Sequence, residues 1–251
     1  MKATIGQPIA LVTGANRGIG LEVARQLGQA GVHVLIGARY PQPGLAAAAE
    51  LTAQGLSAAF LHLDVTNPTT IAVAATQIAS DCGRLDILVN NAGSVMSDDL
   101  PPSRSALDAM RSDFETNFFG VVAVTQAMLP LMERGARGRV VNVSSRGGSL
   151  SLSADAGTAS QLSSRLGYAA SKAAQNMFTI LLGAELRERD ITVHAVTPGL
   201  VKTDLFNRVN RVAARPVRTP AEGAAIIVRC ALSTDEERTS RFVSADGVVP
   251  W

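Results

Sequence analysis

The sequence has almost no excess charge and very little cysteine. Its 251 residues carry 23 basic and 21 acidic side chains, which leaves a formal net charge of +2. A balance this close to zero gives no electrostatic reason to expect nucleic acid or an anionic membrane as a partner. The two cysteines, Cys82 and Cys230, lack Cys-x-x-Cys spacing, which argues against a disulfide scaffold and a zinc site. Such usage is typical of a reducing compartment, and we expect a cytoplasmic protein.

Histidine and long apolar runs are also scarce. The chain has three histidines, at His33, His62 and His194. Each stands alone among apolar residues, so we interpret them as structural and predict no metal site. The most apolar region, residues 118–132, is interrupted by Gln126 and Pro130, which favours a buried helix over a membrane span. The apolar stretch at residues 9–12 is too short for a secretory leader.

Strand-like and helix-like segments alternate along the chain, of which 47% is hydrophobic. Strands are expected at residues 9–13, 32–37, 57–63, 85–89, 139–143 and 191–196. Helices are expected at residues 17–30, 45–54, 69–80, 105–115, 121–134, 168–189 and 221–232, before a short extended tail. Apolar strands without polar alternation are typical of a parallel sheet covered on both faces. The sequence therefore predicts an α/β, Rossmann-type doubly wound sheet of about seven strands, in a single domain at residues 1–251.

Two segments, at about residues 146–166 and 200–218, break this alternation. Irregular segments that follow the strands of such a sheet lie at its carboxyl edge, where ligands bind. We therefore expect both segments to be loops over a substrate site. The second contains a basic run of Arg208, Arg211, Arg215 and Arg218. This run either attracts acidic substrates or forms a solvated helix face.

A glycine-rich turn is expected where the first strand meets the first helix. It reads Thr13-Gly14-Ala15-Asn16-Arg17-Gly18-Ile19-Gly20. Gly14 permits a tight turn, Gly18 lets backbone N–H groups approach a pyrophosphate, and Gly20 lets the helix pack close to the sheet. The N–H groups at the start of the helix favour phosphates. In this context the turn predicts a dinucleotide site, although glycine-rich turns also precede helices that bind nothing.

Tyrosine and lysine are rare, with two and three copies, and one of each stands in a shared motif. Tyr168 and Lys172 are four residues apart on an expected helix, so both project from one face. Tyr40, beside Pro41, has no such partner. An ammonium, together with a positive nicotinamide ring, would lower the pKa of a phenol from ~10 by roughly 1–3 units. The phenol would then exchange a proton with an alcohol or a carbonyl. Taken alone, the pair is equally consistent with an ordinary surface contact.

The Gly-x-x-x-Gly-x-Gly spacing of the turn resembles that of the short-chain dehydrogenase/reductase family. The resemblance covers essentially the whole chain, and its further motifs are Asn90-Asn91-Ala92-Gly93, Asn117, Ser145, Tyr168-Ala169-Ala170-Ser171-Lys172 and Pro198-Gly199. The interval from Ser145 to Tyr168 is longer than is common in the family. Carbonyl-reductase-like members carry insertions there, and the pattern of this sequence is closest to theirs.

The resemblance implies a catalytic group made of Asn117, Ser145, Tyr168 and Lys172. Ser145 would polarise the substrate carbonyl through its hydroxyl, with Ser144 as the competing choice. Lys172 would also bind the nicotinamide ribose, and Asn117 would hold a water molecule of the proton relay behind Lys172.

The end of the second expected strand bears on the choice of cofactor. A carboxylate there would bind the ribose hydroxyls of NAD, but by resemblance the position is Ala38, followed by Arg39. Arg39 and Arg17 would bind the 2′-phosphate of NADP(H) in bidentate geometry; otherwise they are solvated surface residues. Asp64 and Val65 resemble adenine contacts, unless Asp64 caps the next helix. The other cofactor contacts that the resemblance implies are Gly14, Asn16, Gly18, Ile19, Gly20, Asn91, Ala92, Gly93, Tyr168, Lys172, Pro198, Gly199, Val201 and Thr203.

Together these features predict an oxidoreductase that transfers a hydride between NADP(H) and a ketone, aldehyde or alcohol. The alternative is a catalytically silent protein of the same fold that senses NADP(H), which would need the glycine turn but not Tyr168. The expected partner is a small-molecule substrate, with no nucleic acid and no membrane. Both a homodimer and a homotetramer remain open as the assembly.

Overall fold

One sheet runs through the computed structural model, which describes residues 6–96, 100–155, 165–204, 217–233 and 240–251. Its strands are β1 (Ile9–Thr13), β2 (His33–Ala38), β3 (Ala58–His62), β4 (Ile87–Asn90), β5 (Gly138–Val143), β6 (Ile191–Val196), β7 (Phe242–Ser244) and β8 (Gly247–Val248). Their order in the sheet is β3-β2-β1-β4-β5-β6-β7-β8. The seven strands β1 to β7 are all parallel, and β8 pairs with β7 in the antiparallel direction. The predicted α/β class is confirmed, with a short hairpin strand added to the expected seven.

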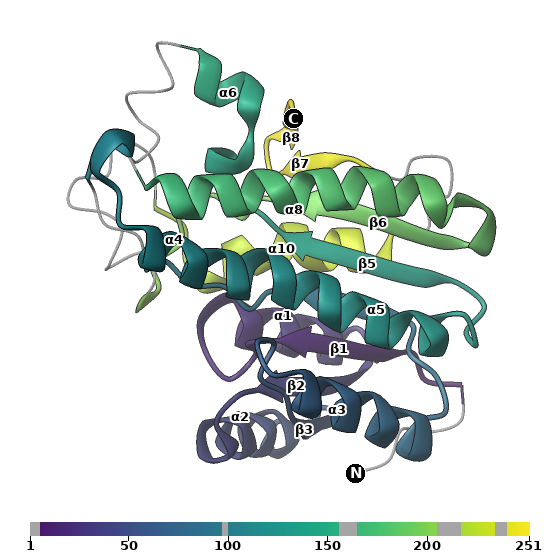
Figure 1. Cartoon of the computed structure of the whole chain (residues 1–251). Helices are drawn as coiled ribbons and strands as arrows, with labels where there is room; N and C mark the ends of the chain where they lie inside the picture. Colours follow the sequence, from purple (N-terminus) through teal and green to yellow (C-terminus); the bar gives the residue numbers. More distant parts are fainter. Residues whose placement is uncertain (1–5, 97–99, 156–164, 205–216, 234–239) are drawn as a thin grey trace.

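Helices cover both faces of this sheet (Figure 1). One layer contains α1 (Gly18–Gln29), α2 (Pro41–Ala53) and α10 (Pro220–Leu232); the other contains α3 (Pro68–Asp81), α4 (Leu107–Phe114), α5 (Gly120–Met132) and α8 (Leu166–Glu185). The apolar strands supply both layers because successive side chains point to opposite faces. On β1, Ala10 and Val12 join the core under α1, α2 and α10, whereas Ile9 and Leu11 join the core under α3, α5 and α8.

The direction of the chain through the sheet changes between β1 and β4. The connections β1–β2–β3 move toward one edge of the sheet, and β4–β5–β6 move toward the other. In doubly wound sheets the crevice at the carboxyl ends of two such strands is the usual ligand site. The structure therefore places the ends of β1 and β4, with the glycine turn and Asn90-Asn91-Ala92-Gly93, at the expected position for a ligand.

The segment at residues 146–166, predicted as a loop, contains regular structure. A 3-10 turn, η3 (Arg146–Gly148), leads into the short helix α6 (Leu150–Ala154), and residues 156–164 lie outside the described part. The C-terminal residues hold α6 in place: the Ser149 hydroxyl donates to the Pro250 carbonyl at 2.7 Å, and the Ser151 amide donates to the Trp251 carbonyl at 2.9 Å. Figure 1 shows α6 beside β7 and β8. This helix needs partners from the far end of the sequence, which local patterns do not reveal.

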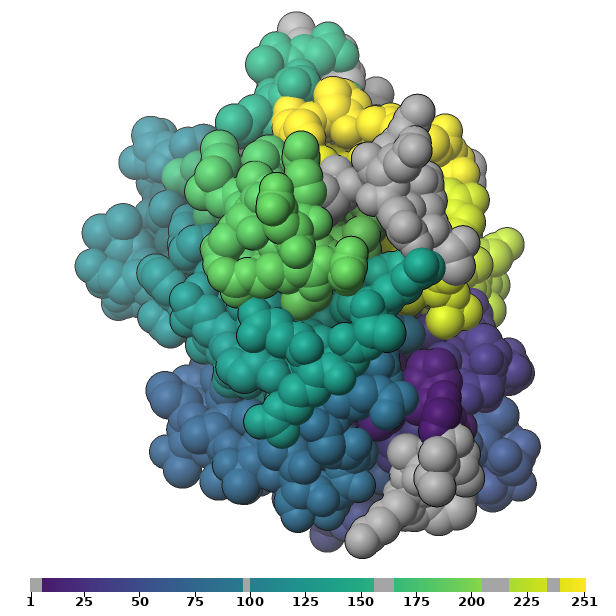
Figure 2. Space-filling view, turned by 90° about the vertical axis from the view of Figure 1, so that its right-hand side faces the viewer, coloured from purple at the N-terminus to yellow at the C-terminus, as the bar shows by residue number. Residues whose placement is uncertain are grey.

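The space-filling view shows which segments lie at the two ends of the molecule (Figure 2). Residues of α8 and the C-terminal strands gather at one end of the molecule, and those of α3 at the other.

The apolar region at residues 118–132 is helical, as predicted. It forms α5, which continues from α4 through a π-helical turn, η2 (Glu115–Phe119). Among the helices that the structure describes, none is long and apolar enough to cross a membrane.

Candidate active site

The glycine turn leaves the start of α1 without an acceptor from its own cap. Gly14 and Gly18 have φ values of +64° and +59°, a region that favours glycine. Arg17 is the N-cap residue of α1, and its side chain makes no capping hydrogen bond. The first N–H groups of a helix have no partner within the helix. Those of α1 therefore point toward the crevice at the end of β1, where an anion would be stabilised.

The second wall of the crevice is the segment after β4, and Thr13 ties it to the glycine turn. The Thr13 hydroxyl accepts the backbone N–H groups of Asn91 and Ala92, both at 3.0 Å. The Asn91 side-chain amide donates to the Thr13 carbonyl at 2.9 Å. Asn91, predicted to contact the cofactor, thus braces the glycine turn with its side chain. Thr13 was not singled out from the sequence, because its partners are more than 70 residues away.

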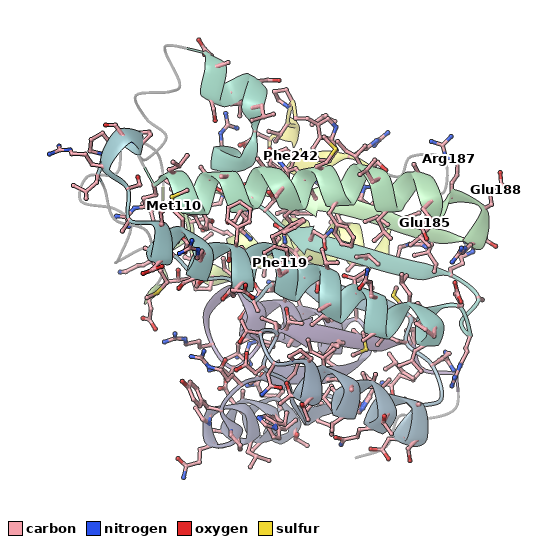
Figure 3. The ribbon with its side chains drawn as sticks, viewed as in Figure 1. Met110, Phe119, Glu185, Arg187, Glu188 and Phe242 are labelled. Carbon is pink, nitrogen blue, oxygen red and sulfur yellow. The ribbon has the colours of Figure 1, made fainter. Side chains whose placement is uncertain are left out.

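Tyr168 and Lys172 lie on the same side of α8, as their spacing predicts. Lys172 Nζ is 6.0 Å from the centre of the Tyr168 ring. Tyr168 also shares a hydrogen bond with the side chain of Ser145, which follows β5. The structure therefore brings together three of the four predicted catalytic residues. The first turn of α8 is held there by α4: a Cβ on Gly167 would lie 2.8 Å from Met110 Cα (Figure 3).

The two serines after β5 point to different surroundings. The Ser144 hydroxyl is buried and donates to Asn176 Oδ1 at 2.7 Å, inside the interface with α8. Ser145 Oγ accepts the Gly147 N–H at 3.2 Å and hydrogen-bonds with Tyr168. Between the two candidates, the geometry therefore favours Ser145 as the residue that faces a substrate.

Asn117, the fourth predicted catalytic residue, is fully buried in the π-helical turn η2. Its Oδ1 accepts the Ser94 N–H at 2.9 Å, and its Nδ2 donates to the Ser94 carbonyl at 2.9 Å and to Ser171 Oγ at 3.1 Å. A Cβ on Gly93 would lie 3.3 Å from Asn117 Oδ1 and 3.9 Å from Lys172 Nζ. Asn117 is thus near Lys172, and its side chain anchors the segment that follows the cofactor motif.

Burial sets the protonation of the Tyr168–Lys172 pair in a way that the spacing did not predict. Burial raises the pKa of Tyr168, the negative charge of Asp113 adds to the rise, and the hydrogen bond with Ser145 opposes it. Burial also lowers the pKa of Lys172 to about 7. The sequence predicted a lowered phenol pKa with the help of a positive nicotinamide ring. For the protein alone the direction is the opposite, because desolvation of the phenolate outweighs the stabilising contacts.

Asp113 is a second residue that sequence reasoning missed. Its side chain is fully buried, its Oδ1 accepts the Met96 N–H at 2.6 Å, and its Oδ2 lies 2.9 Å from where a Gly167 Cβ would stand. It therefore ties α4 to the segment after β4 and lies against the first turn of α8, near Tyr168. The sequence did not reveal the pairing, because the expected helix at residues 105–115 contains Asp113 but ends before Asn117; in the structure α4 continues through η2, and the two residues lie four apart on one helical run.

Arg17 and Arg39, predicted to bind the cofactor phosphate, and Asp64, predicted to contact the adenine, each contact a different residue in the structure. The exposed Arg17 pairs with Asp204, Nη1 to Oδ2 at 2.5 Å, whereas the Arg39 guanidinium lies 4.5 Å from the centre of the Tyr40 ring. The structure thus shows no shared contact between the two arginines among the described residues.

Asp64 does not cap the next helix, which was the alternative to an adenine contact, because its carboxylate accepts from the N–H and hydroxyl of Thr66. Asn67 caps α3 instead.

Four further residues predicted to contact the cofactor are shielded from solvent. Asn16 lies in the glycine turn, Ile19 in the first turn of α1 and Val65 after β3, all half-buried, and Gly20 in α1 is buried.

The segment after β6 folds back over the glycine turn. Thr203 Cγ2 lies 3.4 Å from where a Gly18 Cβ would stand, so the predicted contact Thr203 faces the turn. Arg218 Nη1 donates to the Pro198 carbonyl at 3.2 Å and lies against Gly199, while its Nη2 pairs with Asp246 at 3.2 Å. Arg218 is therefore a brace for the segment from Pro198 to the buried Val201, and not part of a solvated helix face. The other members of the basic run, Arg208, Arg211 and Arg215, lie outside the described residues.

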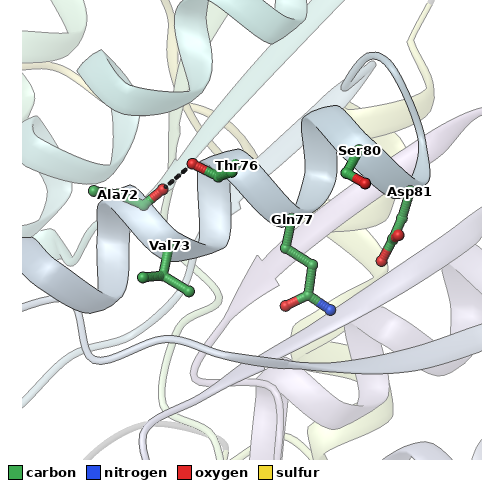
Figure 4. A pocket seen from close by; sticks show the side chains of 6 residues that line it. All are labelled: Ala72, Val73, Thr76, Gln77, Ser80 and Asp81. Atoms are coloured by element: carbon green, nitrogen blue, oxygen red, sulfur yellow. Dashed lines mark hydrogen bonds between the residues drawn. The ribbon is translucent and has the colours of Figure 1, made fainter.

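A surface groove on α3 takes no part in this arrangement. The side chains that line it are Ala72, Val73, Thr76, Gln77, Ser80 and Asp81 (Figure 4). All belong to one helix, and none is a predicted site residue. In the described part of the chain, no group of three His, Cys, Asp or Glu side chains that could hold a metal ion occurs.

A family model for the short chain dehydrogenases matches residues 8–214. This chain belongs to that family. The match includes the glycine turn, the segment after β4, Ser145, and Tyr168 with Lys172. The resemblance inferred from the sequence is thereby confirmed.

The chain matches curated relatives over different shares of their length. It is 32% identical over 237 residues to the short-chain dehydrogenase anuI of Penicillium roqueforti, covering 91% of this chain and 90% of the relative. It is 34% identical over 211 residues to dehydrogenase/reductase SDR family member 7B of Bos taurus, covering 82% of this chain. The chain spans only 61% of that relative's length, and 63% and 59% of its counterparts in Rattus norvegicus and Xenopus laevis.

Solved structures resemble the short-chain dehydrogenase along nearly its whole length. An NADPH-bound carbonyl reductase from chicken fatty liver has a TM-score of 0.85 and 28% identity, with 98% of this chain and 99% of that chain covered. A gluconate 5-dehydrogenase from Burkholderia cenocepacia, in complex with NADP and tartrate, has a TM-score of 0.84 and 25% identity, covering 98% and 96%. The residues found here also fit a nicotinamide dinucleotide, since the uncapped start of α1 offers N–H donors to a pyrophosphate.

Proposed function

We propose that this short-chain dehydrogenase is an NADP(H)-dependent reductase of ketones or aldehydes, which also oxidises the corresponding alcohols. The observation that carries the proposal is the convergence of Ser145, Tyr168 and Lys172 next to Gly93, in the segment that Thr13 ties to the glycine turn. When bound, the cofactor supplies or accepts the hydride. The NADP-containing structures of similar proteins support the choice of cofactor.

Tyr168 is proposed to donate the proton to the substrate oxygen, and Ser145 to hydrogen-bond with that oxygen. The raised pKa of Tyr168 keeps the phenol protonated at neutral pH, which suits a general acid. The hydroxyl of Ser145 hydrogen-bonds with the same phenol, so both donors reach one oxygen atom without reorganisation. A protonated phenol is the form of Tyr168 that carbonyl reduction requires.

Lys172 and Asn117 are proposed to return the proton to Tyr168. Lys172 Nζ lies 6.0 Å from the centre of the Tyr168 ring, and its pKa, lowered to about 7, lets it release a proton near neutral pH. The side chain of Asn117 is occupied by Ser94 and Ser171. Its backbone carbonyl lies in a π-helical turn, where the regular helical hydrogen-bond pattern is interrupted. We propose this carbonyl as the acceptor for a relay water.

The function is tested by measuring NADPH consumption with a panel of ketones and aldehydes, and NADP⁺ reduction with the matching alcohols. Turnover of a carbonyl is expected. NADPH binding without turnover of any member would instead support the silent, NADP(H)-sensing alternative. The homodimer or homotetramer, the cytoplasmic location and the single domain at residues 1–251 stay predictions of the sequence.

The two serines after β5 provide a first test of the site. Ser145→Ala is expected to lower kcat by about 10²- to 10³-fold, since it removes a donor to the oxygen on which charge develops. Ser144→Ala is expected to keep kcat within a few-fold and to lower the free energy of unfolding by about 1–3 kcal/mol, because Asn176 loses a buried partner. Steady-state kinetics and urea denaturation measure the two effects. The reverse pattern would assign the catalytic hydroxyl to Ser144.

Cofactor preference is tested at Arg39. Arg39→Ala is expected to lower kcat/KM for NADPH by about tenfold or more, the cost of losing a charge-assisted contact to a phosphate. The same change leaves kcat/KM for NADH nearly unaltered, because NADH lacks the 2′-phosphate. Arg189→Ala, which removes a half-exposed arginine paired with Glu133, is the matched control. Equal losses with both cofactors would show that Arg39 does not recognise the phosphate.

A further inference from the structure

Gln175 is a polar side chain in the core that the catalytic scheme does not yet use. It lies one turn after Lys172 on α8, and its side chain is fully buried. Its Oε1 accepts a hydrogen bond from Lys172 Nζ at 3.2 Å. The neighbouring buried polar side chains of α8 have partners of their own: Asn176 Oδ1 accepts from the Ser144 hydroxyl, and the Thr179 hydroxyl accepts from Asn142 Nδ2. The side-chain partner of Gln175 is Lys172.

The contacts of Lys172 show what this hydrogen bond does. An ammonium carries three N–H donors. One donates to the Val143 carbonyl at 2.7 Å, and a second donates to Gln175. The side chain of Lys172 is 3% exposed, and Nζ lies 3.9 Å from where a Gly93 Cβ would stand. With two protons held by β5 and α8, the third N–H remains for the side on which Gly93 and Asn117 lie.

The nitrogen of the Gln175 amide destabilises the folded protein, although the amide oxygen binds Lys172. Nε2 of Gln175 is buried and has no hydrogen-bond partner among the residues that the structure describes. A buried donor without a partner destabilises the folded state. An apolar side chain of similar size would avoid that cost, so packing alone does not account for a glutamine at this position.

We propose that Gln175 is a positioning residue for Lys172: it takes one proton of the ammonium and thereby aims the remaining N–H at the catalytic crevice. This inference rests on the proposed function for its role in turnover, but the contact itself is independent of any substrate. Because the glutamine oxygen accepts from the ammonium, it stabilises the charged form of Lys172 against the effect of burial.

Several charged or titratable groups lie on the elements that pack against this part of α8. They are Asp108, Arg111 and Asp113 on α4, Glu115 in η2, Arg146 in η3, His194 on β6 and Tyr168 on α8 itself; Asp108 and Arg111 are exposed and pair with each other. Burial is the cause that shifts the pKa of Lys172, and none of these groups adds to the shift. A change at residue 175 is therefore expected to move the titration of Lys172 without interference from a neighbouring charge.

The scarcity of lysine permits a direct test. The chain has three lysines, so the variant Lys2→Arg/Lys202→Arg leaves Lys172 as the single lysine. With 13Cε-labelled lysine, NMR then follows the titration of Lys172 alone. In this background, Gln175→Leu is expected to lower the titration midpoint by about one unit, and Gln175→Glu to raise it. Thr179→Val is the matched control, because it removes a buried polar group one turn further along α8 and leaves Lys172 untouched.

The outcomes separate this inference from the proposed function. An unchanged midpoint in Gln175→Leu, or a lowered one in Gln175→Glu, would overturn the inference whatever the enzyme does. If the midpoints move in opposite directions but no carbonyl is reduced, the contact stands and the proposed function fails. Where turnover is seen, Gln175→Leu is expected to lower kcat at neutral pH by about fivefold, because less Lys172 is charged there, and to move the alkaline limb of the pH profile with the midpoint. A melting temperature near that of Thr179→Val shows that the fold is intact.

Discussion

Tyr168→Phe is expected to lower kcat for carbonyl reduction by about three orders of magnitude, the middle of the range for a lost general acid. The substitution removes the phenol oxygen and keeps the ring that packs at the start of α8. Lys172 Nζ keeps its hydrogen bonds to Val143 and Gln175, and the glycine turn is not in contact with the change. NADPH is therefore expected to bind with a nearly unaltered Kd. Stopped-flow measurement of hydride transfer and a fluorescence titration with NADPH check the two halves of the prediction.

Tyr40→Phe is the matched control for this experiment, since the chain has two tyrosines. Tyr40 is 59% exposed, and its ring contacts Arg39. The phenylalanine keeps that ring contact, so kcat is expected to stay close to that of the parent protein. Retention of carbonyl reduction by Tyr168→Phe would reject Tyr168 as the acid. Loss of NADPH binding together with activity would make it a structural residue.

Local patterns in the sequence were sufficient to predict the order of the elements and the motifs of the crevice. The turn from Thr13 to Gly20 begins a helix in the structure because Gly14 and Gly18 adopt the positive φ values that their residue type permits. Tyr168 and Lys172 share a face because helical geometry alone determines the positions of residues four apart. In each case the information lies within a few residues, so the sequence carries it directly.

Properties that depend on distant residues could not be predicted in the same way. The helix α6 is held by Pro250 and Trp251, about a hundred residues away. The choice between Ser144 and Ser145 follows from which of them contacts Asn176 on α8. The direction of the pKa shifts depends on how completely Tyr168 and Lys172 are buried. Burial is a property of the assembled fold, and a four-residue spacing contains no measure of it.

Lys172→Met is expected to remove a pH dependence of stability that the parent protein shows between pH 7 and 10.5. The pKa of Lys172 is lowered in the folded protein from 10.5 to about 7. Between these two values the unfolded chain binds a proton that the native protein does not, so the free energy of unfolding rises with pH. Below pH 7 the burial of the charge destabilises the fold in full, and above 10.5 the effect is gone. The free energy of unfolding of the parent, relative to that of Lys172→Met, is expected to rise by about 4 kcal/mol across this interval.

Urea denaturation at a series of pH values measures this difference. Methionine also leaves the Val143 carbonyl and the Gln175 amide without the lysine, but that loss is nearly independent of pH and does not alter the slope. Lys202→Met, at an exposed lysine, is the control. A flat difference between the parent and Lys172→Met would mean that the ammonium is solvated in the folded protein. A rising difference, with turnover lost in Lys172→Met, would show that the charged group is retained at the expense of stability because the reaction requires it.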